Sequence, residues 1–109
     1  MDGVLAGYAQ LRDGPAPACV TGAEPIELLR FYVDSRWHGQ GIAAALMAQV
    51  MAHAHRRGRR TLFLAVWEHN PRAIAFYRKQ GFEEVGSQPF QLGQDVQTDR
   101  VMARALAEG

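Results

Sequence analysis

The spacing of apolar residues changes partway along the chain, and this change restricts the fold more than any other feature of the sequence. Residues 26–33 (IELLRFYV) form an apolar run bounded by Pro25 and Asp34, which predicts a buried strand. Farther along, the apolar positions follow the i, i+3, i+4 spacing of an amphipathic helix. Because residues 61–67 (TLFLAVW) predict another strand, the pattern indicates a helix packed against a sheet. The helical stripe consists of Ile42, Ala45, Leu46, Gln49, Val50 and His53.

The remaining segments add strands and a second helix to this unit. Residues 4–12 (VLAGYAQLR) alternate loosely between apolar and polar, which predicts a strand. The second helix has clear ends, because Asn70 suits an N-cap, Pro71 suits the first helical position and Gly81 suits a C-terminal cap. The predicted order is therefore β-β-α-β-α-β-β in one α/β domain. Its last two strands are predicted over residues 83–92 and 99–106.

Length and composition limit the kind of protein. The chain of 109 residues is 48% hydrophobic, which is enough for one domain over residues 1–109 and not for two. A net charge of +1 predicts no general attraction to nucleic acid or to a membrane. No apolar run approaches the roughly 20 residues of a membrane span. The single cysteine, Cys19, and the absence of a signal-peptide pattern predict a cytoplasmic location.

A basic run at residues 53–60 (HAHRRGRR) follows the first helical stripe. Basic residues at a helix C-terminus are favoured because they complement the helix dipole, and no aromatic residue lies among them to suggest nucleic-acid binding. His53 falls on the apolar stripe, so we expect it in the core. A metal-binding role is not expected, because no cluster of cysteines or carboxylates accompanies it.

The turn between the second strand and the first helix is the segment where chemistry is expected. Gly39 and Gly41 let backbone N–H groups approach a ligand with no Cβ in the way. The first turn of a helix adds unpaired N–H groups and a partial positive charge, so the segment predicts a cradle for a pyrophosphate. The competing interpretation is a turn with a structural role only, which would need the same two glycines.

Two blocks of the chain resemble one known family. Residues 38–43 (HGQGIA) resemble the acyl-CoA-binding signature of the GNAT acetyltransferases, Gln/Arg-x-x-Gly-x-Gly/Ala, with His38 in place of the usual Gln or Arg. A second register with Arg36 in the first place matches the letters but moves Ile42 away from the helix start. Residues 62–82 resemble the later block of the family, a strand followed by Asn70, Ala73, Phe76-Tyr77 and Gly81-Phe82.

The resemblance implies the GNAT-type acyl-CoA N-acyltransferase fold, here lacking the family's first strand and first two helices. It implies an enzyme that uses acetyl-CoA as co-substrate, without a metal, and that acetylates an amine by direct attack. Residues 92–102 (LGQDVQTDRVM) resemble a subset that includes bacterial polyamine acetyltransferases. The residues matched to coenzyme binding are Phe31, Tyr32, Val33, His38, Gly39, Gln40, Gly41, Ile42, Ala43, Asn70, Ala73, Phe76, Tyr77 and Lys79.

The acceptor is therefore expected to be a primary amine, either of a small molecule such as a polyamine or of a peptide. Fold alone does not define the acceptor, because specificity resides in the site. The alternative function is a sensor or subunit that binds acetyl-CoA without turning it over. In the family, the elements missing here form part of the wall around the acceptor.

Tyr77 is the predicted general acid. It lies two helical turns after Asn70, so both side chains share one face of the second helix. A phenol with a pKa near 10 is a workable proton donor to a departing thiolate of pKa about 8.5. The family resemblance implies the same role. The competing interpretation is that Phe76 and Tyr77 are ordinary packing aromatics.

The base that accepts the amine's proton has three candidates. In a regular strand, Glu27 shares a face with Leu29, Phe31 and Val33, and apolar neighbours would raise its pKa. Glu27 could equally be solvated at the start of its strand. The other candidates, Glu68 and His69, follow the third predicted strand.

A homodimer is the expected assembly. With the usual hairpin neighbour absent, the strand at residues 4–12 would present unpaired N–H and C=O groups. Small domains also have little stability in reserve, so burial between two copies would help them.

Overall fold

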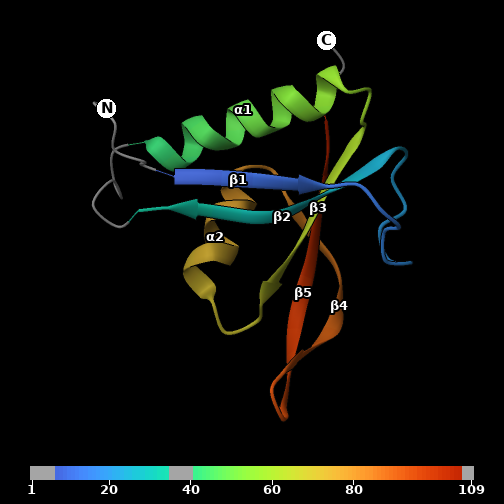
Figure 1. Cartoon of the computed structure of the whole chain (residues 1–109), viewed down its shortest axis with the longest axis vertical. Helices are drawn as coiled ribbons and strands as arrows, with labels where there is room; N and C mark the ends of the chain where they lie inside the picture. Colours follow the sequence, from blue (N-terminus) through green and yellow to red (C-terminus); the bar gives the residue numbers. More distant parts are fainter. Residues whose placement is uncertain (1–6, 35–40, 107–109) are drawn as a thin grey trace.

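The elements occur in the predicted order (Figure 1). The structure is a computed structural model that describes residues 7–34 and 41–106. No helix in these two ranges is both long enough and apolar enough to cross a membrane. The elements are β1 (Gly7–Arg12), β2 (Pro25–Val33), α1 (Ile42–Arg56), β3 (Thr61–Trp67), α2 (Pro71–Lys79), β4 (Glu83–Leu92) and β5 (Asp95–Ala105).

The five strands form one sheet in the order β1-β2-β3-β5-β4. Only β2 and β3 are parallel, since the first helix crosses between them, and the other neighbours are antiparallel. Both helices pack on one face, which we call the helical face; the other is the open face. The sheet contributes Ile26, Leu28, Leu62, Leu64, Val66 and Met102 to the core on the helical face.

The loop between β1 and β2 covers part of the open face. There Val20 packs with Phe63 and Val101 in a second, smaller cluster. Beyond this cluster, β4 and β5 extend as a long hairpin away from the rest of the molecule (Figure 1).

The last strand begins at Asp95, earlier than the predicted residue 99. Pairing with β4 continues to the hairpin turn, where Leu92 lies opposite Asp95 and Gly93 has a φ of 61°. Residues 94–98 are polar except for Val96 and exposed except for Gln97, so they lack the apolar alternation that a strand prediction needs. At the other end, the predicted residues 4–6 of the first strand lie outside the described ranges.

A bulge in β2 changes which face each side chain occupies. Leu11 pairs with Leu28 and Gln10 pairs with Arg30, so Leu29 has no partner in β1. One extra residue reverses the alternation beyond it. Phe31 therefore packs with the core on the helical face, whereas Glu27, opposite Phe63, lies on the open face. The prediction that Glu27 shares a face with Phe31 was wrong for this reason.

The parallel pairing of β2 and β3 is short. Their registered partners run from Pro25 and Thr61 to Glu27 and Phe63, although both strands continue beyond this point. The two strands then diverge (Figure 1). This divergence leaves the carboxyl-terminal half of β2 without a neighbour on its β3 side within the described sheet.

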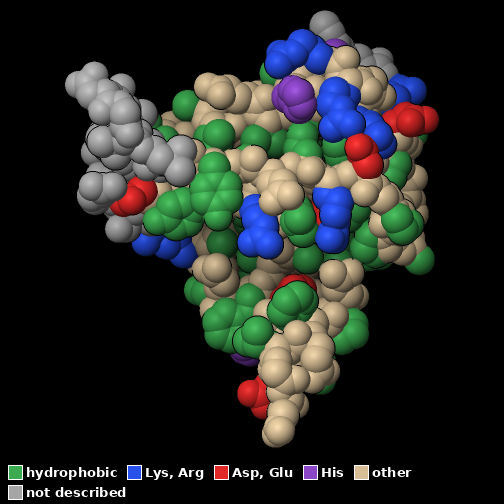
Figure 2. Space-filling view, viewed as in Figure 1, with side chains coloured by type: hydrophobic (Ala, Val, Ile, Leu, Met, Phe, Trp, Pro, Cys, Tyr) green, Lys and Arg blue, Asp and Glu red, His purple; other side chains and the backbone are tan. Residues whose placement is uncertain are grey.

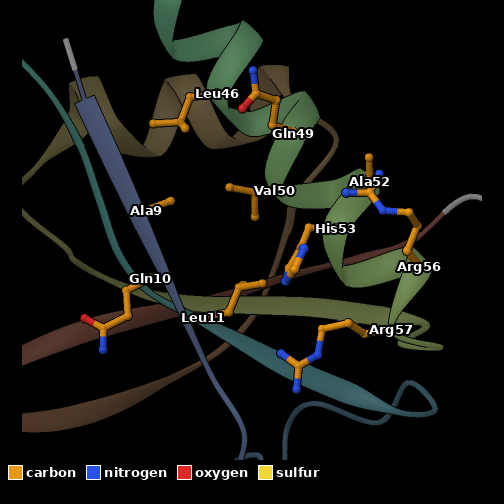
Figure 3. Close-up of a pocket in the computed structure, with 10 residues that line it drawn as sticks. All are labelled: Ala9, Gln10, Leu11, Leu46, Gln49, Val50, Ala52, His53, Arg56 and Arg57. Atoms are coloured by element: carbon orange, nitrogen blue, oxygen red, sulfur yellow. The ribbon is translucent and has the colours of Figure 1, made fainter. Parts of the chain in front are cut away.

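The buried stripe of α1 is centred one position later than predicted. Met47, Val50 and Ala54 are buried, whereas His53 is exposed, so its expected place in the core was wrong. His53 lies where α1 passes the edge strand β1, and no further strand of the described sheet covers it there. It lines a groove of about 740 Å³ between β1 and α1, with Leu11 on the opposite wall (Figure 3).

Candidate active site

A cavity of about 660 Å³ opens on the helical face, between the end of β2, the start of α1 and the exposed side of α2. Every residue predicted to bind the coenzyme that the structure describes lines this cavity. His38, Gly39 and Gln40 lie outside the described residues. Contact with a coenzyme stays a prediction for all of them. The lining also includes three residues that the sequence did not single out, Ala44, Arg72 and Gln80.

The mouth of the cavity is formed by the N-terminus of α1. Its N-cap, Gly41, has a left-handed backbone with φ of 75° and makes no side-chain cap. A Cβ added at Gly41 would meet no atom within 4 Å, so a side chain there would extend into open space at the cavity. The first turn contains no acidic residue. Uncapped N–H groups, the positive end of the helix dipole and an open approach suit a phosphate group.

The cavity's second wall is α2, whose N-terminus is capped as predicted. The side chain of Asn70 accepts a hydrogen bond from the backbone N–H of Ala73 at 3.3 Å, and Pro71 occupies the first position. Because the side-chain oxygen of Asn70 accepts this capping hydrogen bond, the side-chain NH₂ group is the part of Asn70 that can donate to a ligand. Arg72 and Lys79, from opposite ends of α2, place two positive charges at the same cavity.

Tyr77 sits in a cluster of aromatic rings between α2 and β2. Its ring centroid is 6.2 Å from that of Phe31, 5.5 Å from Phe76 and 5.7 Å from Phe82. Burial raises the pKa of the Tyr77 hydroxyl above its ordinary value of 10, so the phenol is neutral and protonated near neutral pH. Within the described part of the chain, this hydroxyl makes no hydrogen bond. Tyr77 thus both packs and presents a proton donor at the cavity.

A second cavity, of about 300 Å³, lies on the open face and is lined by Glu27, Phe63, Ala65 and Gln88 among others. The Glu27 carboxylate does not lie among apolar neighbours only, as its strand position predicted. It accepts two hydrogen bonds from the Arg12 guanidinium, at 2.6 and 2.9 Å. The bulge at Leu29 accounts for this, because it places Glu27 beside Arg12 of β1 on the open face.

The two cavities lie on opposite faces of the sheet, next to the place where β2 and β3 diverge. Tyr77 belongs to the cavity on the helical face, and Glu27 belongs to the one on the open face. A reacting group held between the diverging strands would meet a proton donor from one side and a carboxylate from the other. This arrangement suits the transfer of a group between two ligands that enter from opposite faces.

The other two candidate bases line neither of these cavities. Glu68 is half-buried just after β3, and its backbone N–H donates to the carbonyl of Thr98 at 3.1 Å. Its carboxylate lies 3.9 Å from Nε2 of His69. His69 is exposed and packs its ring edge-to-face against Trp67. The structure therefore brings Glu27, and not Glu68 or His69, to a cavity beside the diverging strands.

The fold and this cavity define a class of α/β domains in which two parallel strands diverge beside a helix that begins at a glycine. The family model described as "Acetyltransferase (GNAT) family" matches residues 1–82. The chain belongs to the acetyltransferase (GNAT) family.

Relatives agree with this assignment, and solved structures share the fold. An uncharacterized N-acetyltransferase of Mycobacterium tuberculosis is 39% identical over 105 residues, which cover 96% of this chain and 63% of the relative. The ribosomal-protein-alanine N-acetyltransferase of Brucella melitensis superposes with a TM-score of 0.78 at 30% identity, covering 97% of this chain and 65% of that one. A Salmonella typhimurium protein solved with its cofactor acetyl-CoA has a TM-score of 0.79 at 21% identity, covering 100% of this chain and 62% of that one. The chain thus spans less than two thirds of the length of these proteins.

Proposed function

We propose that this chain carries the coenzyme-binding and catalytic part of an N-acetyltransferase, which moves an acetyl group from acetyl-CoA to a primary amine. The observation that carries the proposal is the 660 Å³ cavity, which joins the uncapped N-terminus of α1, the end of β2 and the Tyr77 face of α2. The N–H groups at Gly41 to Ala43 would hold the pyrophosphate. The unpaired half of β2 would hydrogen-bond the amide-rich arm of the coenzyme through Phe31 to Val33.

The transfer needs one bond to form and one to break. The nitrogen of the neutral amine attacks the carbonyl carbon of the thioester, a carbon–nitrogen bond forms, and the carbon–sulfur bond breaks. The sulfur takes a proton from the Tyr77 hydroxyl. Before the attack, the ammonium form of the amine loses one proton to Glu27, directly or through water, because an amine with a pKa of about 10.4 is mostly protonated at neutral pH. After the carbon–nitrogen bond has formed, the nitrogen loses a second proton, which reaches the Tyr77 phenolate through water and restores the phenol.

The acceptor proposed is a primary amine of a small molecule, polyamines among them, or of a peptide. The name of the Brucella melitensis relative, a ribosomal-protein-alanine N-acetyltransferase, supports the peptide class. The resemblance of residues 92–102 to a subset with bacterial polyamine acetyltransferases supports the small-molecule class equally. We also propose a cytoplasmic location, since the lone cysteine, Cys19, is a free thiol.

The second candidate function is coenzyme binding without turnover, as a sensor or subunit. The contact that favours it is the ion pair of Glu27 with Arg12 at 2.6 Å, because a base held by a guanidinium is less available to an amine. Calorimetry with acetyl-CoA tests binding, and a mass-spectrometric screen of amines with acetyl-CoA tests transfer. Binding together with an acetylated product supports the enzyme. Binding with no product from any amine class supports the sensor, and the absence of binding contradicts both.

A further inference from the structure

The cavity on the open face, of about 300 Å³, is lined by two side chains of opposite charge, Arg12 and Glu27. They are ladder partners in β1 and β2 and therefore lie on the same face of the sheet. The other described residues that line this cavity are uncharged. Its volume is at the lower end of the roughly 300–1,000 Å³ that small-molecule sites occupy. The cavity therefore suits a small ligand that has both a positive and a negative group.

The ion pair between Arg12 and Glu27 leaves a donor and an acceptor for such a ligand. Nε and Nη2 of Arg12 both donate to the same oxygen, Oε1 of Glu27, at 2.9 and 2.6 Å. Within the two described ranges, Nη1 of Arg12 and Oε2 of Glu27 make no hydrogen bond. A guanidinium has N–H donors on all three of its nitrogens and binds carboxylates strongly. A second carboxylate can therefore bind Arg12 while an ammonium group binds the free oxygen of Glu27.

The Arg12 guanidinium is accessible to a ligand. The side chain of Arg12 is 58% exposed, whereas that of Glu27 is 18% exposed. Because the guanidinium is largely in solvent, its ion pair stabilises the fold only modestly, and a ligand can replace part of it. The next residue, Asp13, does not compete for Arg12, since it pairs with Arg57 and Arg59. Figure 2 shows acidic and basic side chains next to one another at this end of the molecule, near the end of α1.

The loop after β1 supplies an apolar wall of the cavity. Its residues 15–17 line the cavity, and the carbonyl of Pro17 accepts a hydrogen bond from the backbone N–H of Val20 at 2.9 Å. Val20 in turn packs against Phe63 and Val101, which line the same cavity. The loop is therefore fixed on the sheet, and the apolar wall suits the carbon skeleton of a small ligand.

Glu27 lies where β2 leaves β3, because its pairing with Phe63 is the last in the parallel register. Ala65, two residues farther along β3, lines the same cavity. An amine bound to Glu27 therefore lies beside the opening between the strands, across the sheet from the cavity that Tyr77 lines. Arg12 lies on the other side of Glu27, since β1 and β3 flank β2. A ligand bound to both side chains presents its amine to the opening and its carboxylate to β1.

We infer that Arg12 binds a carboxylate of the acceptor, so that the preferred acceptor is a free α-amino acid. This role rests on the proposed acetyl transfer and specifies its small-molecule acceptor. Because Arg12 and Glu27 are in contact, the two groups that they bind must be close together, as the amine and the carboxylate of an α-amino acid are. An amine without a negative group is repelled by the guanidinium. The carboxylate of the acceptor also draws Arg12 away from Glu27, which frees Glu27 to accept the amine's proton.

The test compares the common L-α-amino acids with their carboxamides in acetylation assays with acetyl-CoA. A carboxamide keeps the amine and the side chain but removes the negative charge, and it also represents the first residue of a peptide. Rates are compared per concentration of neutral amine, because the two amines differ in pKa. For the best amino acid of the panel, we expect kcat/KM to exceed that of its carboxamide by roughly tenfold or more.

Arg12→Gln should lower kcat/KM for that amino acid by roughly tenfold or more. For the carboxamide, kcat/KM should stay unchanged or rise, because Glu27 is released from its ion pair, whereas a purely structural role of Arg12 would lower both values. Arg12→Lys, which keeps the charge, should retain part of the preference. Arg100→Gln is the matched control, because Arg100 donates to Glu84 at the same distance of 2.6 Å and lines neither cavity.

Equal kcat/KM values for amino acids and carboxamides across the panel would overturn the inference and leave the proposed acetyl transfer intact. An Arg12→Gln protein that keeps the preference, or an Arg100→Gln protein that loses it as fully, would also overturn it. Thermal melting and acetyl-CoA calorimetry show whether each variant is folded. If Arg12→Gln is not, the wild-type comparison and Arg12→Lys decide.

Failure of the proposed function gives a different result, because acetyl-CoA would then fail to bind or no amine would be acetylated. Calorimetric binding of the amino acids and their carboxamides to the wild type and to Arg12→Gln still tests the role of Arg12 in that case. Tighter binding of an amino acid that depends on Arg12 supports the role. Equal binding of the two ligands contradicts it.

Discussion

Phe31 of β2 and Tyr77 of α2 meet edge to face, with their ring centroids 6.2 Å apart. This contact joins the strand that diverges from β3 to the helix that carries the proposed acid. It exists because the bulge at Leu29 places Phe31 on the helical face. The hydroxyl of Tyr77 is therefore held at the cavity by packing and not by a hydrogen bond within the described residues.

Tyr77→Phe should lower kcat by roughly 10²- to 10⁴-fold while the affinity for acetyl-CoA stays near that of the wild type, because the change removes the proton donor and keeps the ring. Steady-state kinetics and calorimetry measure the two effects. Since burial raises the pKa of Tyr77 above 10, ionisation of this phenol should not reduce the wild-type rate below pH 10. Tyr8→Phe, at an exposed tyrosine on the open face, is the control. An unchanged kcat where chemistry is rate-limiting would leave Tyr77 with a packing role only.

Gly41→Val should weaken acetyl-CoA binding at least tenfold, a change of about 1.4 kcal/mol. A branched side chain at the N-cap would occupy the space through which a phosphate must approach the first turn of α1. Gly58→Val is a close control, because Gly58 has a similar φ of 78° and equally open surroundings but does not line the cavity. Calorimetry on both variants separates backbone strain from lost binding. Equal affinities would move the phosphate site elsewhere.

Glu27→Gln should lower kcat/KM roughly 10²-fold or more at neutral pH, whereas Glu68→Gln should have little effect, because only Glu27 lines the cavity on the open face. If Glu27 accepts the amine's proton, the loss should shrink as the pH approaches the amine's own pKa of about 10.4, where free amine is abundant. A pH–rate profile of both variants measures this. A larger loss in Glu68→Gln would reassign the base.

Asp13 connects the loop after β1 to the end of α1, and its ion pairs predict a pH effect on stability. The hydrogen bond from Arg57, together with the charges of Arg57 and Arg59, lowers the pKa of Asp13 below 3.8. A lowered pKa stabilises the fold above pH 3.8, and this contribution is lost as the pH falls through the folded-state value. Asp13 and Arg57 are exposed and Arg59 is partly exposed, so their effect on the free energy of unfolding should be small.

Thermal melting of the wild type and Asp13→Asn measures that effect. We expect Asp13→Asn to melt at a lower temperature at pH 6, and the difference to vanish in acid. Asp95→Asn, whose carboxylate has no ion pair within the described residues, should show no such pH-dependent difference. A difference that persists below the folded-state pKa would assign the effect of Asp13 to packing.

The edge of β1 predicts self-association, and we propose a two-fold dimer through it. β1 is an edge strand of the described sheet, and the groove beside it contains the apolar side chains Leu11 and Leu46 among polar and charged ones (Figure 3). Sedimentation equilibrium should detect dimers at micromolar concentration. Leu46→Glu should weaken them, whereas Ala48→Glu, exposed and outside the groove, should not. A folded wild-type protein that stays monomeric would contradict the proposal.

Most elements of the fold were predictable because their signals are local. Asn70 caps α2 as its side chain suggests, and the apolar run of β3 coincides with the predicted residues 61–67. The strand predicted over residues 83–92 coincides with β4, whereas the first part of β5, residues 95–98, was not predicted, because Val96 is its only apolar residue and no apolar alternation marks it. The place of His53 was wrong because burial depends on where the neighbouring sheet ends, which the helix's own sequence does not record.

The sequence by itself determined the order of the elements, the family and the set of residues that gather around the cavity on the helical face. The order follows from short-range spacing, such as a glycine turn before a stripe or an asparagine before a proline. The family and the cavity residues follow from the resemblance of two motifs, and Ala44, Arg72 and Gln80 were not among the predicted residues. Only the tertiary structure decided which face each β2 side chain occupies, because one unpaired residue at Leu29 reverses the alternation beyond it. It also decided that Arg12 pairs with Glu27 and that Asp99 lies buried beside Trp67. Those contacts join strands far apart in the chain, and the register between strands is set by packing across the whole sheet.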